Sequence, residues 1–276
     1  MTQAQCDQQL NLLGAHIQHG PANDRIYLIS LGNAEPGPLL DALRALALQH
    51  GYGKIIAKLP EHKAGLFLAY GFSEEARIPN FYQGQDAVFL ARYQDKTRQF
   101  RTMPELDTLL ERARSDIKPE FHSPAEVSRC REEDLPQMAR LYSEVFPSYP
   151  FPIEDPEFLR QNMASDVDYF GIRQQGRLIA LASAEKDPKS LSAEMTDFAT
   201  LPQARGQGCA RTLLAHMEQA IFHQGYRTAY TIARAVSVGM NRTFAAADYR
   251  YGGRLHLNTQ IGGQIESMNL WHKSIA

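Results

Sequence analysis

Two glycines and an arginine within four residues form the part of this chain whose residue types most clearly suggest chemistry. Arg205, Gly206 and Gly208 follow Leu201-Pro202 and precede apolar residues at Ala210, Leu213, Leu214, Met217 and Ile221. Proline has no amide donor, so a strand should stop before the turn, and the apolar spacing after it is helical. Glycines at the start of a helix leave its first amides and its positive dipole end open to phosphate. We therefore predict an anion-binding turn at residues 205–210.

Two common glycine motifs do not match this turn. The dinucleotide fingerprint needs a third glycine where Arg211 stands, and the P-loop needs Gly-Lys-Ser/Thr after its glycines. The pattern that remains is R-x-x-G-x-A with an additional glycine directly after the arginine. A glycine-rich turn without a ligand is the alternative interpretation.

This turn resembles the acetyl-CoA signature of the GCN5-related N-acetyltransferases (GNAT). In that family the turn amides hold the pyrophosphate of acetyl-CoA, and the preceding strand pairs its backbone with the pantetheine arm. The resemblance thus implies acetyl-CoA as co-substrate and the following cofactor-binding residues: Phe198, Ala199, Thr200, Arg205, Gly206, Gln207, Gly208, Cys209, Ala210, Arg211 and Asn241. We interpret Cys209 as a small packing residue, since acetyl transfer in this family is direct.

Composition excludes several other classes of protein. The 276 residues carry a net charge of -2, which does not favour nucleic acid or a membrane surface as partner. No apolar run is long enough to span a membrane, and the N-terminus lacks a signal sequence. Cys6, Cys130 and Cys209 are far apart and odd in number, so we expect neither a disulfide framework nor a metal site. A cytoplasmic protein is the default prediction.

The order of predicted elements gives an α/β (mixed α+β) fold with two related parts. A strand at 26–31, a helix at 38–50, a strand at 54–58, a helix at 62–70 and a strand at 88–93 precede a polar stretch. From Val127 onward the order is strand, two helices, three strands, helix, strand, helix, strand, as expected of GNAT proteins. The order from Gly51 to Tyr93 recurs weakly from Gly225 to Trp271.

We therefore predict a degenerate GNAT-like domain at 1–100, a linker with a helix at 101–122, and a catalytic GNAT domain at 123–276. The catalytic domain should contain a central mixed, mostly antiparallel sheet flanked by helices. The first domain has no R-x-x-G-x-A turn, so we expect it to bind no cofactor. A substrate lid, a surface for a homodimer and a stabilising remnant all remain open as its role.

Further stretches are similar to the bacterial and archaeal β-lysine N-acetyltransferases over nearly the whole chain. They are Val-Phe-Pro-Ser-Tyr-Pro-Phe-Pro-Ile (145–153), Ala-Glu-Met-Thr-Asp-Phe-Ala-Thr-Leu-Pro (193–202), Tyr-Thr-Ile-Ala-Arg-Ala (230–235), Gly-Met-Asn (239–241), Glu-Ser-Met-Asn-Leu-Trp (266–271) and Ile-Pro-Asn-Phe-Tyr-Gln-Gly (78–84). That family transfers acetyl to the side-chain amine of β-lysine and gives N6-acetyl-β-lysine, a compatible solute in osmoadaptation. The resemblance implies lysine 2,3-aminomutase as the pathway partner that supplies β-lysine.

Transfer to an amine requires a base, because an alkyl ammonium with a pKa near ~10.4 cannot attack a thioester. The resemblance places an acidic residue on the strand before the turn, where Glu194 and Asp197 stand. Strand alternation predicts that these two side chains point to opposite faces. We favour Glu194 as base. Asp197 is a candidate either to anchor an ammonium group or to cap a backbone turn, and a structural carboxylate is the alternative for each. Amides near Phe198 should polarise the thioester carbonyl.

The leaving thiolate needs a proton, which the superfamily often takes from a tyrosine seven residues after an asparagine. Asn241 is present, but position 248 is Asp, and the nearest tyrosines are Tyr249 and Tyr251. We name Tyr249 and Tyr251 as candidate acids. Asn241 is either a cofactor contact or a helix cap.

The carboxylate of β-lysine suggests an arginine as partner, since a guanidinium binds carboxylates with two hydrogen bonds. Arg234 ends the strand that should splay from 194–201, and Arg77 of the first domain is a second candidate. Tyr149 and Phe151 are expected to line the acceptor site. Three alternatives stay open: another small amine such as a polyamine or diamino acid, a protein lysine, and a non-catalytic acyl-CoA sensor.

Overall fold

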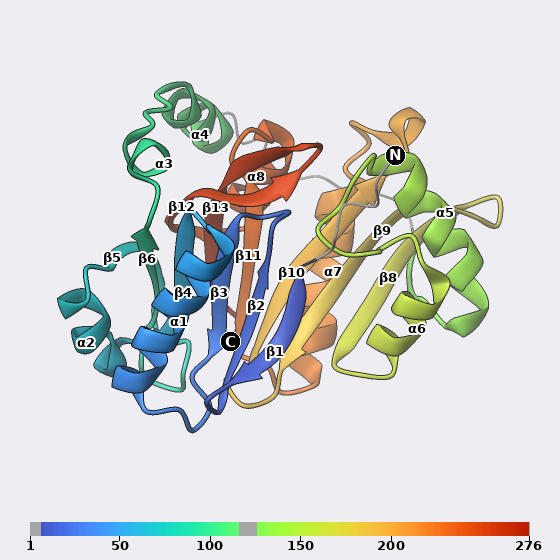
Figure 1. Cartoon of the computed structure of the whole chain (residues 1–276). Coiled ribbons are helices and arrows are strands. Elements are labelled where there is room, and N and C mark those ends of the chain that lie inside the picture. Colours follow the sequence, from blue (N-terminus) through green and yellow to red (C-terminus); the bar gives the residue numbers. More distant parts are fainter. Residues whose placement is uncertain (1–6, 116–125, 276) are drawn as a thin grey trace. The chain divides into compact units, whose positions relative to one another are not determined.

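The structure is a computed structural model that describes residues 7–115 and 126–275. The chain divides into two compact units (Figure 1). The first contains residues up to Pro104 together with Gly252–Met268, and the second contains Glu105–Tyr251 and Asn269–Ala276. Residues 116–122 of the predicted linker, and Cys6, lie outside the described residues.

The first unit is a twisted sheet with helices. Its strands are β1 (Gln8–Leu12), β2 (Ala15–Gly20), β3 (Arg25–Ser30), β4 (Lys54–Pro60), β5 (Ser73–Ile78) and β6 (Ala87–Tyr93), and its helices are α1 (Pro36–His50), α2 (Ala64–Ala69, after a 3-10 turn at Glu61–Lys63) and α3 (Lys96–Phe100). The strand order is β1-β2-β3-β4-β6-β5, followed by β12 (Arg250–Ile261) next to β5. Only β3 and β4 run parallel within this set of described pairs.

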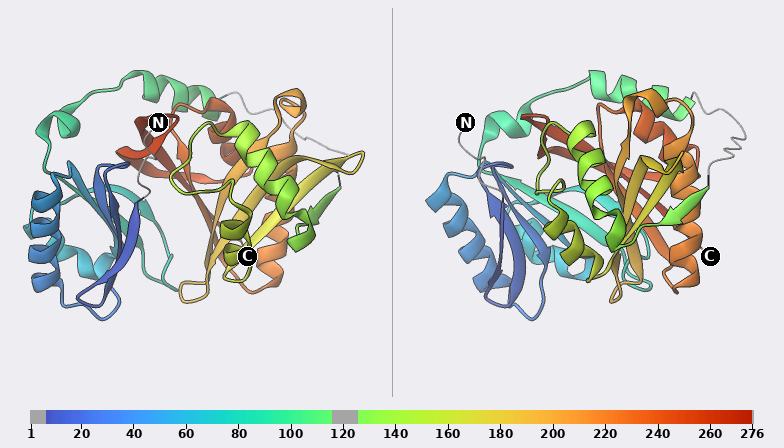
Figure 2. Two further views of the ribbon diagram at one scale, coloured as in Figure 1. Left: turned by 45° about the vertical axis from the view of Figure 1, so that its right-hand side comes forward. Right: turned by 90° about the vertical axis from the view of Figure 1, so that its right-hand side faces the viewer.

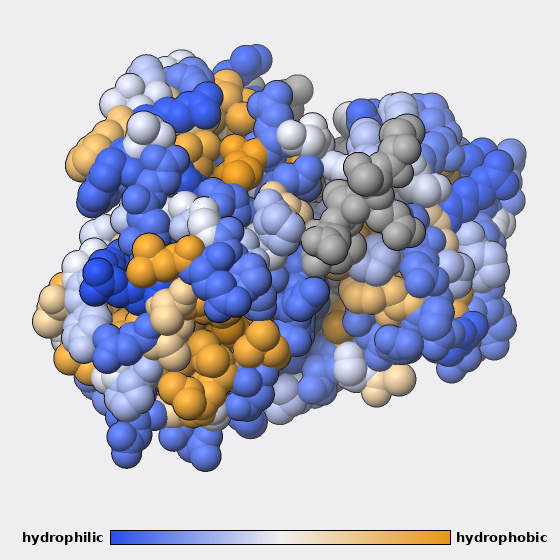
Figure 3. Space-filling model, viewed as in Figure 1, coloured by the Kyte–Doolittle hydropathy of each residue, from blue (hydrophilic) through white to orange (hydrophobic). Residues whose placement is uncertain are grey.

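Helix α1 forms where the sequence predicts it. Proline in its first turn needs no amide partner, and Gly51 ends it in the left-handed conformation with φ 70°. Its apolar face, with Leu39, Leu40 and Leu43 fully or nearly fully buried, packs on β2–β4 to form the core of this unit. Apolar residues also gather on the surface in the region of α1 and α2 (Figure 3), where Leu48 is 65% exposed.

The second unit has a mixed, mostly antiparallel sheet. Its strands are β7 (Val127–Arg129), β8 (Val167–Gln174), β9 (Arg177–Asp187), β10 (Ser192–Thr200), β11 (Thr228–Arg234) and β13 (Gln264–Ser274), and its helices are α4 (Glu105–Ser115), α5 (Leu135–Val145, after a 3-10 turn at Glu132–Asp134), α6 (Pro156–Met163), α7 (Cys209–His223) and α8 (Val238–Ala245). The strand order is β13-β11-β10-β9-β8-β7, with β10 and β11 parallel. This arrangement confirms the predicted fold class.

Helices cover both faces of this second sheet (Figure 2). Helix α7 packs on one face, in a core that includes Ala193, Met195 and Leu213. Helices α5 and α6 pack on the other face, in a core that includes Tyr142, Ala199 and Leu201. A residue's membership of one core or the other therefore tells which face of the sheet it occupies.

The division of the chain differs from the predicted domain boundaries in two places. Helix α4 was predicted as part of a linker, but it contacts α8, and Leu110 belongs to the core of the second unit. Residues Gly252–Met268 were predicted in the catalytic domain, but their contacts place them in the first unit. The sequence could not show this, because a hairpin carries no local sign of the sheet on which it packs.

The predicted order of elements lacks two of the observed strands. Strand β5 lies in the stretch after Gly71-Phe72, and β12 lies between Tyr249 and Gly262-Gly263. Both have a weak strand signal: β5 is rich in charge, and β12 contains Gly252-Gly253. The remaining predicted strands and helices are present to within a few residues of the expected bounds.

Candidate active site

The predicted anion-binding turn connects β10 to α7. After Leu201, a 3-10 turn at Pro202–Ala204 leads to Gly206 and Gly208, both left-handed with φ 77° and 76°. Gly208 is the N-cap residue of the 15-residue helix α7, and no side chain caps that helix. Its first amides thus lack a side-chain acceptor, as an anion-binding helix start requires. The helix begins at Cys209, within the predicted turn at 205–210.

Strands β10 and β11 separate after Glu194, as predicted. Their parallel pairing covers Ser192, Ala193 and Glu194, whereas β10 continues to Thr200 and β11 to Arg234. Backbone groups on the facing edges past Glu194 are therefore not used in a β10–β11 ladder. An extended ligand can pair with such edges.

A β-bulge interrupts β10 at the centre of the site. Thr196 pairs with Ser183 and Ala199 with Leu181, so Asp197 and Phe198 together stand opposite one residue of β9. Asp197 has φ 55°, a left-handed conformation that is uncommon for residues other than glycine. The bulge exchanges the faces of the strand: Met195 belongs to the core under α7, whereas Ala199 belongs to the core under α5 and α6.

The expectation that Glu194 and Asp197 point to opposite faces is therefore wrong. Glu194 alternates with Ala193 and Met195, so it faces the α5–α6 side of the sheet. Asp197 accepts a hydrogen bond there from Tyr149, which packs against the core on that side. Simple alternation fails because the bulge adds one residue between the two carboxylates.

The Asp197 carboxylate is buried, and each of its oxygens accepts a hydroxyl hydrogen bond. Tyr149 Oη donates to Oδ1 at 2.6 Å, and Ser183 Oγ donates to Oδ2 at 2.6 Å. Burial raises the pKa of this carboxyl group, and the hydroxyl donors oppose that rise. Burial and the Asp197 charge raise the pKa of Tyr149 well above its usual value, so Tyr149 stays protonated and donates.

Glu185 was not predicted as a site residue. It lies directly opposite Glu194 in the β9–β10 ladder, so the two carboxylates share a face at neighbouring positions. Ser183, which binds Asp197, was also missed. The hairpin between Asp187 and Ser192 contained the signal, because its loop length fixes which residues stand opposite each other.

The predicted acceptor residues lie on the same face. Tyr149 packs its ring against Phe151 at 4.9 Å between ring centres, and Phe151 in turn lies 5.4 Å from Phe158. On β11, Ala233 belongs to the α7 core, so the next residue, Arg234, faces the α5–α6 side together with Glu194.

Asn241 is a structural residue, which corrects its prediction as a cofactor contact. Its Nδ2 donates to the Arg234 and Ser237 carbonyls at 2.9 and 2.8 Å. Its Oδ1 accepts from Asn269 Nδ2 at 2.9 Å and Trp271 Nε1 at 2.8 Å. These four bonds use every donor and acceptor of the buried amide, so none is left for a ligand.

Arg77 is also unsuited to its predicted role. In the first unit its guanidinium pairs with Glu61, Glu74 and Asp86 at 2.7–2.9 Å, and these hydrogen bonds raise its pKa. A side chain held by three carboxylates is not available for the carboxylate of a substrate.

The comparisons with known proteins agree with this geometry. The model of the "Acetyltransferase (GNAT) family" matches residues 135–252. A protein of Methanococcus maripaludis named beta-lysine N(6)-acetyltransferase is 35% identical over 93% of this chain and 95% of its own. The chain belongs to this family of GNAT acetyltransferases. It is an acyl-CoA-dependent N-acetyltransferase.

Two further relatives cover most of the chain. A Methanosarcina mazei protein of the same name is 32% identical over 83% of this chain and 94% of its own. The N-acetyltransferase YodP of Bacillus subtilis is 30% identical over 95% of this chain and 96% of its own. The similarity thus includes the first unit as well as the GNAT segment.

The remaining predicted cofactor residues of this acetyltransferase surround the turn. Phe198 lies edge-on to Phe244 at 5.7 Å between ring centres, and Thr200 ends β10. Arg205 Nε donates to the Thr200 carbonyl at 3.2 Å, and Gln207 Nε2 donates to the Gln203 carbonyl at 3.2 Å. Buried Cys209, Ala210 and Arg211 form the first turn of α7.

The two candidate acids of the acetyltransferase have different surroundings. Tyr249 is buried, and its hydroxyl faces Glu218 without a well-aligned hydrogen bond. Glu218 binds Lys273 at 2.7 Å and lies roughly two and a half turns into α7, away from the anion-binding turn. Burial and the Glu218 charge raise the pKa of Tyr249 well above its usual value. Tyr251, half-buried with its ring 5.6 Å from Trp271, is the better candidate.

No group of three or more His, Cys, Asp and Glu side chains within residues 7–115 and 126–275 is arranged to hold a metal ion. In the same ranges, no helix is long and apolar enough to cross a membrane.

Proposed function

We propose that this acetyltransferase transfers the acetyl group of acetyl-CoA to the side-chain amine of β-lysine, which gives N6-acetyl-β-lysine. The observation that carries the proposal is the grouping of Glu185, Glu194, Asp197 and Arg234 on one face of the sheet, in a chain whose relatives include two named for β-lysine. A small zwitterionic diamine has two ammonium groups and one carboxylate. Charges of both signs on one face complement it.

Glu194 is the proposed base. It lies at the point where β10 and β11 separate, next to the bulge that ends at Phe198. A carboxylate at this place takes the proton that the attacking ammonium must lose. Glu185, directly opposite, adds negative charge that favours an ammonium group over a neutral group at the same place.

Asp197 is proposed to act through Tyr149. Its two hydroxyl donors hold the carboxylate, and the carboxylate in turn fixes the Tyr149 ring beside Phe151. This arrangement orients an aromatic wall for the alkyl chain of the acceptor and adds negative charge for an ammonium group. Arg234 is the proposed partner of the acceptor carboxylate.

The turn suits acetyl-CoA. Gly206 has no atom within 4 Å of the place where a Cβ would stand, and α7 offers uncapped amides directly after Gly208. We propose that these amides bind the pyrophosphate, that the free edge of β10 pairs with the pantetheine arm, and that amides of the Asp197–Phe198 bulge hold the thioester carbonyl oxygen. Tyr251 is the proposed source of a proton for the thiolate.

N6-acetyl-β-lysine is a compatible solute, so we propose a role in osmoadaptation inside the cell. The substrate is then supplied by an isomerase that moves the α-amino group of lysine to the β-carbon, as a lysine 2,3-aminomutase does.

The test is release of CoA from acetyl-CoA with six acceptors: β-lysine, α-lysine, ornithine, putrescine, spermidine and a lysine peptide. Turnover confined to β-lysine supports the proposal. Equal or better turnover of putrescine or spermidine would replace β-lysine by a polyamine, which the adjacent carboxylates Glu185 and Glu194 also suit. Turnover of the peptide alone would show that the acceptor is a protein lysine.

A further inference from the structure

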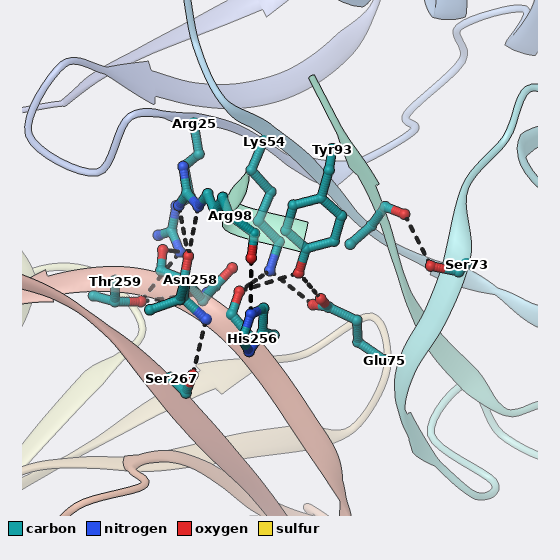
Figure 4. Close-up of polar contacts among 12 residues, drawn as sticks. Arg25, Lys54, Ser73, Glu75, Tyr93, Arg98, His256, Asn258, Thr259 and Ser267 are labelled. Atoms are coloured by element: carbon teal, nitrogen blue, oxygen red, sulfur yellow. Dashed lines mark hydrogen bonds and ion pairs between the residues drawn. The ribbon is translucent and has the colours of Figure 1, made fainter. Parts of the chain in front are cut away.

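Three cationic side chains buried in the first unit all donate to the same short segment (Figure 4). They are Arg25, Lys54 and Arg98, which we call the cation clamp. Their acceptors are the backbone carbonyls of three consecutive residues, 256–258, in β12. The clamp residues come from β3, β4 and α3, so three separate elements of the first unit hold the middle of strand β12, more than 150 residues later in the chain.

Lys54 is the most buried of the three, with no exposed surface. Its Nζ donates to the His256 carbonyl at 2.7 Å and pairs with Glu75 Oε2 at 2.8 Å. The Tyr93 hydroxyl donates to the other oxygen of Glu75. Glu75 is therefore the shared acceptor that fixes both Lys54 and Tyr93 below the hairpin.

Arg98 holds the point at which the hairpin backbone is strained. Its Nε and a terminal nitrogen donate to the Leu257 carbonyl at 3.0 and 2.5 Å, and another terminal nitrogen pairs with Asp24 at 2.9 Å. Leu257 has φ 41°, which a leucine rarely adopts, and its amide donates a hydrogen bond to the Ser267 hydroxyl oxygen at 2.9 Å. A strained backbone of this kind persists only where its surroundings fix it.

The hairpin also approaches β5 closely. Gly253 pairs with Ala76 and has φ 133°, and a Cβ at Gly253 would lie 2.3 Å from the Glu75 carbonyl oxygen. Arg25 completes the arrangement with bonds to the Asn258 carbonyl and to Thr259 Oγ1, the latter at 3.1 Å. Main chain and side chains of the first unit thus hold one side of the hairpin along its length.

Buried charges of this kind contribute little net stability to a fold, because they lose their hydration. Burial lowers the pKa of Lys54 to about 8 and that of Arg25 to about 10, so each cation is held at the expense of its hydration. Apolar residues of the same size often stabilise a protein as well as a buried ion pair does. The three directed donors of the cation clamp instead fix the position and register of β12, because each binds a particular backbone carbonyl.

The held hairpin continues into the second unit. Residue Ser267 of β13 belongs to the first unit, and Asn269 and Trp271 of the same strand belong to the second. Both donate to Asn241 Oδ1, and Asn241 donates to the Arg234 carbonyl at the end of β11. A continuous strand and three hydrogen bonds therefore connect the clamped hairpin with the end of a strand that bounds the active site.

We propose that the cation clamp is a positioning device for acetyl transfer: it fixes β12 of the β12–β13 hairpin, and the base of that hairpin in β13 sets the position of α8 and of Arg234 through Asn241. The clamp residues are positioning residues that touch no reacting atom. This proposal needs only acetyl transfer, whichever amine is accepted.

The chain offers a matched pair of substitutions. Glu75→Gln leaves one acceptor for the two donors Lys54 and Tyr93 and so weakens the clamp. Glu74→Gln makes the same chemical change at the neighbouring residue, whose exposed carboxylate binds Arg77 and not the hairpin. Arg98→Lys keeps the charge but loses the fork that binds Leu257. Circular dichroism and thermal unfolding establish that each variant is folded.

Two readouts report on the hairpin. Trp271 is the single tryptophan of the chain and is 1% exposed, so its fluorescence reports the packing of the hairpin base. The second readout is kcat, and the KM of acetyl-CoA, with whichever of the six acceptors the wild type converts fastest.

For Glu75→Gln and Arg98→Lys we expect Trp271 emission at longer wavelength and a kcat lower by about 10- to 100-fold, the loss expected for a misplacement near 1 Å, with the KM of acetyl-CoA unchanged. Glu74→Gln should match the wild type in both. Folded clamp variants with wild-type emission and kcat would overturn the proposal, even if their unfolding temperature were lower. If Arg98→Lys does not fold, the Glu75→Gln and Glu74→Gln pair decides. If no acceptor is converted, Trp271 emission alone decides.

Discussion

The segment from β3 to β6 and the segment from β10 to β13 have the same plan. Each runs strand, helix, strand, helix, strand, strand, and the strand orders are β3-β4-β6-β5 and β10-β11-β13-β12. In each the first two strands of that order are parallel, and the first strand carries a bulge, at Ile29 in β3 and at Asp197–Phe198 in β10. This likeness supports our interpretation of the first unit as a degenerate copy of the second half of the GNAT fold.

The copies differ where a ligand would be held. Helix α1 starts with Glu35 as N-cap and with prolines at 36 and 38, so two of its first amides are missing and a negative charge stands beside the others. Helix α7 starts after Gly206 and Gly208 with its amides present. The same backbone plan is thus suited to bind an anion only where the residues of one turn leave donors available.

The parallel strand pairs β3–β4 and β10–β11 also differ in the side chains that they carry. The pairing of β3 with β4 places Tyr27 in the register that Glu194 has in the second copy, and β4 ends at Pro60 where β11 ends at Arg234. The first copy uses its polar side chains, Arg25 and Lys54, to hold the β12–β13 hairpin instead. If the first unit is a degenerate copy, as we propose, it has kept the packing of the fold while its polar positions took a different task. Four predictions test this comparison, from the largest expected effect to the smallest.

Glu194→Gln should lower kcat by about 10²- to 10⁴-fold, because it removes the proposed base without changing the shape of the side chain. The KM of acetyl-CoA should stay the same. Tyr27→Phe, in the same register of the first copy, is the control and should leave kcat unchanged. Steady-state CoA release measures both, and a Glu194→Gln enzyme with wild-type kcat would show that Glu194 is only structural.

Arg234→Ala should distinguish acceptors by their carboxylate. A charged hydrogen bond contributes about 1.5–3 kcal/mol, so kcat/KM for β-lysine should fall about 10- to 100-fold. The value for 1,5-diaminopentane, which has no carboxylate, should change little. Equal losses for the two amines would reject Arg234 as the carboxylate partner.

Gly208→Asp and Gly37→Asp place the same charge near the start of the helix that follows the first strand of each copy. Gly208→Asp should raise the KM of acetyl-CoA roughly tenfold, because a carboxylate repels the pyrophosphate at the helix end. Gly37 has open space around its Cβ position, and its substitution should not change that KM. An unchanged KM in a folded Gly208→Asp enzyme would remove the anion-binding turn from the mechanism.

Asp197→Asn separates stability from activity. Burial raises the pKa of Asp197 above that of the unfolded chain, so this carboxyl group binds a proton more tightly in the folded than in the unfolded state. The stability that this group contributes is complete at low pH and is lost as the pH rises through the folded pKa. The uncharged variant should avoid that loss and be more stable than the wild type near pH 7, with reduced kcat/KM for the acceptor.

Urea unfolding at pH 5 and pH 8 measures this difference, which should be larger at pH 8. A variant that is less stable at both values would show that the bonds from Tyr149 and Ser183 to a charged acceptor outweigh the burial of the charge. The first copy has apolar Ile29 at its bulge and contains no corresponding effect.

The sequence by itself determined the local elements and the family. Pro202, the two turn glycines and the apolar spacing of α7 act within a few residues of one another, so they predict a strand, a turn and a helix without knowledge of the rest. The placement of Glu194 before the turn, and of Arg234 at the end of a separating strand, followed from the same local order.

Tertiary structure decided how the side chains meet. The bulge in β10 turned Asp197 toward the face of Glu194, the β9–β10 register placed Glu185 beside it, and the contacts of Asn269 and Trp271 made Asn241 a structural residue. The task of the first unit likewise depends on bonds between residues more than 150 positions apart. Such contacts cannot be predicted from a local sequence pattern, because each is made by two segments that come together only when the sheet forms.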